Sequence, residues 1–465
     1  MSRSETWFWE GAETLTAPAL LTPAGALSYA DLTTQADALF AGLPRGLVAI
    51  LCDKTATTII AYLGALRAGQ VPLLLDADLQ PTPLARTISA YAPEFVVAPS
   101  AVSLDGYSPL KTIGGASVLC AETASGPAPH SDLALLLPTS GSTGDPKCVR
   151  LSHRAIDSCT RAICDYLAMA PERRTVSLLP FHYSYGLSVL NITLASRASM
   201  VITDASVLSR DLWALVEAEG ITDFSGVPFM FETLRRMRFS QDVLETLRCV
   251  TQAGGRLDPK LTRHFRTLFS QARIPYFTMY GQTEAAPRIS YLSPEMAEEK
   301  EGSVGIPISC GTAEIAETGA ATGEGELLYR GPNVCMGYAR SRADVALGDM
   351  LEGALLTGDH VSIDADGYIT IVGRRARFIK VHGISVNLDH VETVLKAAGH
   401  SALVVGKENR VLVLHTPADT DRLAATMVEN FTFHPSVVRY TEVVELPLTA
   451  SGKPDYAGAS AAHLG

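Results

Sequence analysis

A run of hydroxyl, glycine and lysine residues is the clearest candidate for chemistry in this chain. Residues 139–147 read Thr-Ser-Gly-Ser-Thr-Gly-Asp-Pro-Lys and follow a short apolar run. Glycines let successive backbone N–H groups approach a ligand and form an anion-binding nest. The hydroxyls and the Lys147 ammonium add donors and positive charge. Because Pro146 precedes Lys147, the G-x-x-x-x-G-K-[ST] pattern does not fit. The segment predicts a phosphate clamp, and a flexible linker is the alternative.

The composition restricts the class of protein and its partners. The chain has 465 residues, enough for more than one domain. Its net charge of −11 argues against a broad basic surface for nucleic acid. The 8 cysteines include no Cys-x-x-Cys pair, so they are expected to be core residues in a reducing compartment. The start has no signal-peptide pattern, and the apolar runs are too short to span a bilayer. We expect a cytoplasmic protein without a membrane span.

Helical and strand patterns alternate along most of the chain. Residues 47–51, 71–75 and 95–98 are short apolar runs typical of buried strands, and residues 29–40 and 55–68 have helical spacing. Strands separated by helices favour parallel sheets and an α/β fold. We therefore expect a large N-terminal domain of α/β subdomains with parallel sheets, followed by a small α+β domain.

The predicted domain boundary lies at the basic segment 373–377, which separates domain 1–373 from domain 374–465. Before it, residues 356–359 and 363–368 are predicted turns between short strands. After it, a helix is expected at 391–397 and a strand at 411–415.

Seven short motifs in order make the chain resemble the acyl-adenylate-forming enzymes, which include acyl-CoA synthetases, stand-alone adenylation domains and firefly luciferase. The matching segments are 139–147, Tyr280-Gly281-Gln282-Thr283-Glu284, Gly325-Glu326-Leu327 with Gly331 and Gly337-Tyr338, Thr357-Gly358-Asp359, Gly373-Arg374, Ile379-Lys380 with Gly383, and Ser451-Gly452-Lys453. Each motif is weak alone, whereas the series covers nearly the whole chain. The resemblance implies the family's fold and its ATP-dependent chemistry.

The resemblance implies roles for the charged and hydroxyl residues. Adenylation joins a carboxylate to the α-phosphate of ATP and releases pyrophosphate, so developing charge must be neutralised and the reactants held in line. Lys147 and the loop are expected to hold the β- and γ-phosphates. Glu284 is expected to help hold Mg²⁺, Thr283 to contact the α-phosphate, and Lys453 to stabilise the pentavalent transition state. The loop residues are Thr139, Ser140, Gly141, Ser142, Thr143 and Gly144.

Further residues are expected, by resemblance, to bind the nucleoside. Tyr280 would stack near adenine, with Gly281 beside it in the same motif. Gly254-Gly255 would let the backbone lie flat beside the base and the acyl group, although an ordinary tight turn is as good a reading. Asp359 would accept hydrogen bonds from the ribose hydroxyls, and Arg374 would support the ribose or the phosphates.

A thiol is the expected acceptor in a second half-reaction. The small domain is expected to be mobile and to rotate between two poses. One pose presents Lys453 to ATP, and the other presents the thiolation segment with Lys380 and Gly383 to the thiol. Gly383 would admit a pantetheine arm. Because no carrier domain follows Lys453 in the sequence, we expect CoA or the phosphopantetheine of a separate carrier protein.

The hinge departs from the family pattern. Family members commonly have Asp or Lys at the position occupied here by Ala376. Its neighbours Arg375 and Arg377 are expected to supply the charge that the hinge lacks.

The segment 180–187 occupies the family's acid-pocket motif and points to the substrate class. Its candidate residues are His182, Tyr183, Ser184, Tyr185 and Gly186. Enzymes for α-amino acids usually place an aspartate where Ser184 stands, and residues 178–194 contain no acidic residue. An unpaired ammonium group in a pocket would be costly. We therefore expect a fatty or aryl acid. Phe229 is a candidate pocket wall, and core packing is the alternative for it.

Two further functions remain open from the sequence. One is adenylation followed by transfer to an amine or another nucleophile, which Ala376 leaves open. The other is a non-catalytic nucleotide-binding protein. The charged residues Lys147, Glu284, Asp359 and Lys453 are all kept, which argues against this second alternative.

Overall fold

A computed structural model describes most of the chain. The described residues are 7–98, 103–113, 115–123, 126–138, 147–235, 239–316, 323–374, 377–381, 384–417, 420–431, 435–449 and 454–464. They form two compact units. The first holds the described residues of Met1–Thr139, Asp145–Thr312 and Tyr329–Leu355, and the second holds those of Ala313–Leu328 and Leu356–Gly465. The boundary that we predict at 373/374 lies inside the second unit and stays a proposal.

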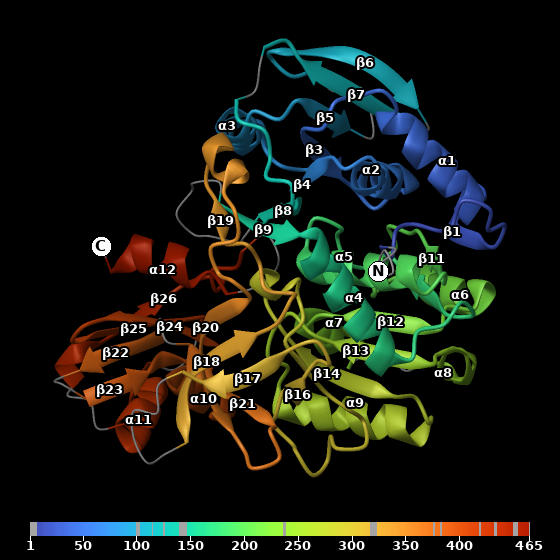
Figure 1. The fold of residues 1–465 in the computed structure, drawn as a ribbon. Helices are drawn as coiled ribbons and strands as arrows, with labels where there is room; N and C mark the ends of the chain where they lie inside the picture. Colours follow the sequence, from blue (N-terminus) through green and yellow to red (C-terminus); the bar gives the residue numbers. More distant parts are fainter. Residues whose placement is uncertain are drawn as a thin grey trace. The chain divides into compact units, whose positions relative to one another are not determined.

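The largest sheet of the first unit has the strand order β19-β9-β8-β4-β3-β5-β7-β6. Its centre, β8-β4-β3-β5, is parallel, and the strands added at both edges are antiparallel. α2 packs against β3 and β4, and α1 packs against α2 (Figure 1). The elements are β3 (Leu47–Cys52), β4 (Val71–Asp76), β5 (Phe95–Ala98), β6 (Tyr107–Ile113), β7 (Ala116–Ala121), β8 (Leu133–Pro138), β9 (Cys148–Ser152), β19 (Tyr338–Ala339), α1 (Tyr29–Phe40), α2 (Ala56–Arg67), α3 (Pro81–Tyr91) and η2 (Arg342–Ala346).

Both faces of this sheet are buried, which explains the continuous apolar runs. Every residue of β3 is buried. Because side chains alternate along a strand, Val48 and Ile50 join one hydrophobic core, whereas Leu47 and Leu51 join another. Central parallel strands covered on both faces read as uninterrupted apolar sequence. The predicted α/β class and the strands at 47–51, 71–75 and 95–98 are therefore confirmed.

Two further sheets complete the first unit, with the orders β12-β13-β14-β15-β16 and β10-β11-β1-β2. The strands are β1 (Pro18–Thr22), β2 (Gly25–Ser28), β10 (Arg174–Val176), β11 (Ser199–Val201), β12 (Asp223–Gly226), β13 (Cys249–Gln252), β14 (Tyr276–Tyr280), β15 (Ser290–Leu292) and β16 (Ile306–Pro307). The helices are α4 (His153–Leu167), α5 (Ser184–Ala195), α6 (Arg210–Glu219), α7 (Pro228–Leu234), α8 (Gln241–Thr246), α9 (Pro259–Gln271) and η1 (Thr283–Ala285).

The five-stranded sheet explains why distant candidate residues meet. Strands β12, β13 and β14 are parallel neighbours, so their carboxyl ends lie at one edge. The segments that follow these strands carry Phe229 at the start of α7, Gly254-Gly255, and residues 281–284. Ligands bind at the carboxyl ends of parallel strands in open α/β sheets. The topology therefore gathers candidates that lie far apart in the sequence.

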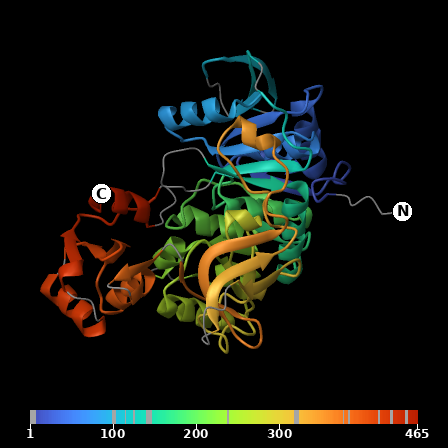
Figure 2. The same cartoon turned by 60° about the vertical axis from the view of Figure 1, so that its left-hand side comes forward.

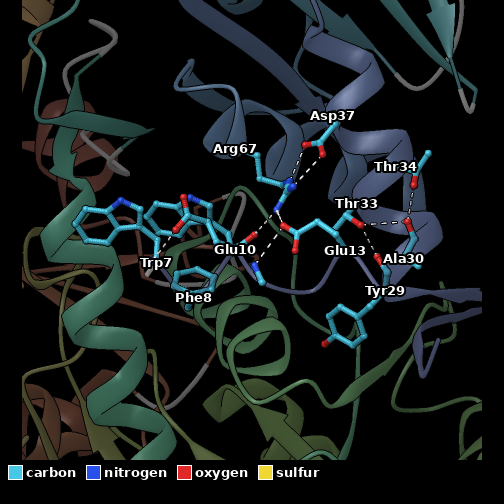
Figure 3. Close-up of polar contacts among 12 residues, drawn as sticks. Trp7, Phe8, Glu10, Glu13, Tyr29, Ala30, Thr33, Thr34, Asp37 and Arg67 are labelled. Atoms are coloured by element: carbon cyan, nitrogen blue, oxygen red, sulfur yellow. Dashed lines mark hydrogen bonds and ion pairs between the residues drawn. The ribbon is translucent and has the colours of Figure 1, made fainter. Parts of the chain in front are cut away.

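Arg67, in the last turn of α2, binds residues of α1 and of the segment that precedes β1. Its guanidinium binds Asp37 at 2.6 and 2.8 Å, Glu13 at 2.8 Å and the carbonyl of Trp9 at 3.0 Å (Figure 3). Asp37 belongs to α1, whereas Glu13 and Trp9 lie before β1. One cation therefore ties two helices and the N-terminal segment together.

The second unit contains strands of the sheet β17-β18-β20-β21 and a small α+β body with the sheet β24-β25-β26. α10 and α11 share a core on one face of this small sheet, and α12 contributes to the core on the other face (Figures 1 and 2). The elements are β17 (Thr312–Ile315), β18 (Glu324–Arg330), β20 (Ala354–Ile363), β21 (Ile369–Arg374), β22 (Phe378–Val381), β23 (Ile384–Asn387), β24 (Ala402–Lys407), β25 (Arg410–His415), β26 (Val438–Glu442), α10 (Leu388–Ala397), α11 (Thr420–Asn430), η4 (Pro435–Val437) and α12 (Tyr456–His463).

One local prediction was wrong. We expected a turn at 356–359, but these residues lie inside the ten-residue strand β20. Gly358 has a φ of +75° and its N–H donates to the Glu326 carboxylate at 3.1 Å. The glycine therefore bends a continuing strand instead of ending it. The predicted turn at 363–368 is confirmed, and the helix expected at 391–397 begins three residues earlier, at Leu388.

All eight cysteines lie in the described part of the chain and are free thiols, five of them buried. Within the described residues, no helix is long and apolar enough to cross a membrane.

Candidate functional site

The acid-pocket segment forms the start of α5 in the first unit. Tyr183 is the residue before the helix, and Ser184 is its first residue. Gly186 packs so closely on the preceding turn that a Cβ would lie 2.2 Å from the Pro180 carbonyl oxygen. A glycine is therefore required at 186 for this turn to fold back on the helix.

A small apolar cleft between side chains adjoins this helix. Its lining includes Leu179, Phe181, Gly186, Val189 and Ser225. The cleft has no room for a water molecule, so it holds no part of an acid as these side chains stand.

His182 lies just before α5, close to Asp76, the last residue of β4. Its Nε2 is 3.7 Å from the Asp76 carboxylate, and its Nδ1 is buried without a hydrogen-bond partner among the described residues. Burial lowers the pKa of His182, and Asp76 and Asp78 oppose that shift. The imidazole is therefore neutral at pH 7.

The Tyr-Gly-Gln-Thr-Glu segment meets the acid-pocket segment directly. The Thr283 hydroxyl donates to the Ser184 hydroxyl at 3.1 Å. Gly254 has a φ of +83°, and a Cβ there would lie 2.6 Å from the Tyr183 phenol oxygen. Gly281 is equally constrained, because a Cβ would collide with the Pro287 carbonyl. The glycines at 254 and 281 are thus packing requirements, and contact of Gly254-Gly255 with the base and the acyl group stays a prediction.

Tyr338 links two charged candidates. The Lys147 Nζ lies 3.4 Å from the centre of the Tyr338 ring, and the Tyr338 hydroxyl donates to Glu284 at 2.9 Å. Pairing of β19 with β9 places Tyr338 opposite Val149, two residues after Lys147. Burial and the Glu284 carboxylate raise the pKa of Tyr338, so the phenol stays protonated. The sequence motif includes Tyr338, but its bridging position becomes visible only in the structure.

Asp359 and Arg374 meet within the second unit. They are cross-strand neighbours on β20 and β21, with the Arg374 Nε 3.2 Å from the Asp359 carboxylate. Asp359 is only 4% exposed, whereas the Arg374 side chain is 71% exposed. Two residues that we expected near the ribose are therefore neighbours on adjacent strands, and their contact with a nucleotide stays a prediction.

The segment that follows β21 is tied to α10. A Cβ at Gly373 would lie 2.5 Å from the Asn387 amide, and Asn387 also caps α10. Arg377 is buried and binds Asp389 and Glu392, each at 2.7 Å. Its charge is therefore used inside the small body, contrary to the expectation that Arg377 serves the hinge.

Several predicted residues lie outside the described part of the chain. These are Thr139, Ser140, Gly141, Ser142, Thr143, Gly144, Ala376, Gly383 and Lys453. The Lys380 backbone belongs to β22. Phe229 is 64% exposed, whereas its neighbours Met230 and Phe231 are core residues. Phe229 therefore does not pack in the core, and its role as a pocket wall stays a prediction.

The sequence analysis missed Arg288, a buried cation eight residues after Tyr280. A charged residue between Pro287 and Ile289, so close to a binding motif, was the available signal. Within the described residues, no cluster of three or more metal-ligating side chains is present. That Glu284 helps hold a magnesium ion stays a prediction.

Known proteins share this sequence pattern and fold. The profile of a family described as "AMP-binding enzyme" matches residues 7–339. The phenyloxazoline synthase MbtB of Mycobacterium tuberculosis (strain ATCC 25618 / H37Rv) is 28% identical over 479 residues, which are 95% of this chain and 33% of MbtB. The 2-succinylbenzoate–CoA ligase of Bacillus subtilis (strain 168) is 28% identical over 335 residues, which cover 69% of this chain and 67% of that ligase. The chain spans 33–40% of the length of the MbtB proteins.

Solved structures show the same architecture. The o-succinylbenzoate CoA synthetase MenE of Bacillus subtilis in complex with AMP superposes with a TM-score of 0.78, at 23% identity and 97% coverage of each chain. ATP-bound MatB of Rhodopseudomonas palustris gives a TM-score of 0.77 at 21% identity, covering 98% of this chain and 97% of MatB. MenE has also been solved with ATP and a magnesium ion. At such identities the likeness establishes the fold.

Proposed function

Because the chain belongs to the AMP-binding enzyme family, we propose that it is an ATP-dependent ligase for a carboxylic acid. A carboxylate oxygen attacks the α-phosphorus of ATP, the bond to the β-phosphate breaks, and acyl-AMP and pyrophosphate form. A thiolate then attacks the acyl carbonyl and AMP leaves. The observation that carries this proposal is the Thr283–Ser184 hydrogen bond. It joins the residue expected at the α-phosphate to the segment expected to hold the acid.

The charged residues of the first unit suit ATP and Mg²⁺. Lys147 and Glu284 lie on either side of Tyr338. A lysine supplies a compact positive charge for phosphate oxygens, and a carboxylate oxygen is the ligand that Mg²⁺ prefers. In our proposal Lys147 binds the β- and γ-phosphates, and Glu284 helps hold the ion.

The nucleoside and the transition state have their own residues in this proposal. Asp359 accepts hydrogen bonds from the ribose, supported by Arg374, while Tyr280 stacks on adenine. Thr283 contacts the α-phosphate, and Lys453 stabilises the transition state. These assignments rest on the family motifs and on the buried Asp359 carboxylate.

The acid lacks a free α-ammonium group in this proposal. Ser184 offers a neutral hydroxyl that already accepts from Thr283, and residues 178–194 provide no carboxylate. An ammonium ion at Ser184 would lose its hydration without gaining a counter-charge from this segment. Aryl and fatty acids need no such counter-charge, and an aryl acid agrees with the names of the 2-succinylbenzoate–CoA ligases among the relatives.

The acceptor is CoA or the phosphopantetheine of a carrier protein. CoA is favoured by the relatives that are named CoA ligases. Arg377 forms ion pairs with Asp389 and Glu392, so its charge does not replace the one that Ala376 lacks at the hinge. Transfer to an amine therefore remains the second candidate. A cytoplasmic location also stays a prediction.

Pyrophosphate release with a panel of fatty, aryl and α-amino acids tests this function. Each acid is assayed without a thiol, with CoA, and with a phosphopantetheine-loaded carrier protein. Release with a fatty or aryl acid and a thioester product supports the proposal. Release without a thioester favours the amine acceptor, and a preference for α-amino acids contradicts the pocket argument.

Replacing Lys453 with alanine tests the mechanism. We expect acyl-AMP formation to fall by about a hundredfold or more, because a charge that acts in the transition state is lost. ATP binding and the melting temperature should stay unchanged. Lys396→Ala, an exposed lysine of α10, is the control. Unchanged adenylation in Lys453→Ala would remove this lysine from the mechanism.

A further inference from the structure

Arg288 is a buried cation whose Nε lacks a hydrogen-bond partner within the described residues. The residue is 2% exposed, and the Nε atom itself is buried. A guanidinium removed from water costs several kcal/mol unless it is paired. A group from outside this part of the chain therefore has to complete the site.

The other buried arginines of the described chain form hydrogen bonds or ion pairs through their guanidinium groups. Arg150 donates to the carbonyls of residues 336, 338, 347 and 348. Arg342 binds the Glu94 carboxylate, and Arg377 binds Asp389 and Glu392. Among these four, Arg288 alone has a buried guanidinium nitrogen without a hydrogen-bond partner in the described part of the chain. Its isolation is thus a local feature and not a property of every buried arginine here.

The surroundings of Arg288 belong to the acid-pocket segment. Its guanidinium carbon lies 5.4 Å from the centre of the Tyr185 ring. The Tyr185 hydroxyl is already occupied by Thr251 at 2.8 Å, so it offers Arg288 only its ring face. The positive charge also acts on Tyr183, since burial raises the pKa of both phenols and Arg288 opposes that rise. Arg288 therefore borders the two aromatic side chains expected to hold the acid.

Burial argues that Arg288 does not serve the reacting carboxylate. That group must be reached by ATP and then by a thiol, and Thr283, which is expected at the α-phosphate, is half-buried. Arg288 and Tyr185, at 2% and 4% exposure, are more completely buried than Thr283. We therefore assign Arg288 to a part of the acid other than the reacting carboxylate.

We propose that Arg288 binds a second carboxylate on the acid, so that the substrate is a dicarboxylic acid. The planar guanidinium matches a carboxylate through two parallel hydrogen bonds and supplies the charge that balances it. This inference rests on the proposed function, because it names the substrate class of the same site. It makes Arg288 a specificity-determining residue for the acid.

The test compares acids in matched pairs. Each pair has one carboxylate or two on the same carbon skeleton, either linear fatty chains or benzene rings. Pyrophosphate release is measured for the wild type, Arg288→Met and Arg288→Lys. In the wild type we expect kcat/KM to favour the diacid by at least about tenfold. Arg288→Met should lower the diacid kcat/KM by about a hundredfold, mostly through KM. The ratio of diacid to monoacid should fall to about one, and Arg288→Lys should restore part of it.

The melting temperature distinguishes a ligand-binding role of Arg288 from a purely structural one. Removing an unpaired buried charge should leave the ligand-free melting temperature unchanged or raise it. The control Arg150→Met removes a satisfied guanidinium and should lower it. Diacids should raise the melting temperature of the wild type but not of Arg288→Met.

Three results would overturn this inference. One is a wild type that prefers monoacids. Another is an equal loss for both members of each pair in Arg288→Met, which would assign Arg288 to the reacting carboxylate or to ATP. The third is a fall in melting temperature like that of Arg150→Met. All three leave the proposed ligase standing, whereas no pyrophosphate with any acid contradicts the ligase and this inference together.

Discussion

The hydroxyl of Thr283 donates a hydrogen bond to the hydroxyl of Ser184 at 3.1 Å, across 99 residues of sequence. Thr283 follows the end of β14, and Ser184 begins α5. Neither hydroxyl carries charge, so the contact positions two segments without creating a counter-ion. The acid and the nucleotide are therefore expected to meet at this point.

Substituting Ser184 with aspartate should change which acids react. A carboxylate at this position would pair with the ammonium group of an α-amino acid and repel an incoming carboxylate. We expect ATP–pyrophosphate exchange with α-amino acids to appear, and exchange with the native acid to fall at least about tenfold. Ser184→Ala is the control, because it removes the hydroxyl without adding charge. If Ser184→Asp and Ser184→Ala behave alike, Ser184 does not face the α-carbon.

Removing the Tyr338 hydroxyl should weaken the binding of magnesium-bound ATP. Tyr338→Phe keeps the ring beneath Lys147 but loses the hydrogen bond to Glu284, which is worth about 1 kcal/mol or more for a charged acceptor. We expect KM for ATP to rise about fivefold in Tyr338→Phe and further in Tyr338→Ala, where Lys147 also loses its support. Tyr107→Phe, which removes a hydrogen bond to the Pro93 carbonyl, serves as the control and should leave KM unchanged.

His182 should make the folded state sensitive to acid. Burial lowers its folded pKa below the ordinary value of 6.5. The unfolded chain therefore binds a proton first as the pH falls, and the stability contributed by the neutral imidazole is present above pH 6.5 and lost below it. We expect the free energy of unfolding to fall below pH 6.5 more steeply in the wild type than in His182→Gln. Parallel curves for the two proteins would show that His182 makes no such contribution.

Arg67 should be a stability residue without a role in binding. Its side chain is 10% exposed and joins Asp37, Glu13 and the Trp9 carbonyl. Arg67→Met leaves these acceptors without their donor, so we expect the free energy of unfolding to fall by about 2 kcal/mol. Denaturant titration measures this. Arg263→Met, which breaks the half-exposed pair with Glu301, should cost under about 1 kcal/mol. If both variants lose the same free energy of unfolding, the burial of Arg67 does not strengthen its ion pairs.

The sequence by itself determined the family and most of the local structure. The order of the motifs identified the adenylating chemistry, because each motif is a short segment that can be recognised in the sequence. Strands β3, β4 and β5 were predicted from apolar runs, and α1 from helical spacing. A local signal also misled, since Gly358 suggested a turn and instead bends a strand that continues because its neighbours pair with it.

Only the tertiary structure decided which side chains meet. Tyr338 reaches Lys147 and Glu284 because β19 pairs with β9, and Thr283 reaches Ser184 because a strand end faces a helix start. Arg377 forms its ion pairs within the small α+β body, and the Nε of Arg288 has no hydrogen-bond partner within the described residues. Pairing and its absence depend on residues far apart in the chain, and packing alone brings such residues within hydrogen-bonding distance.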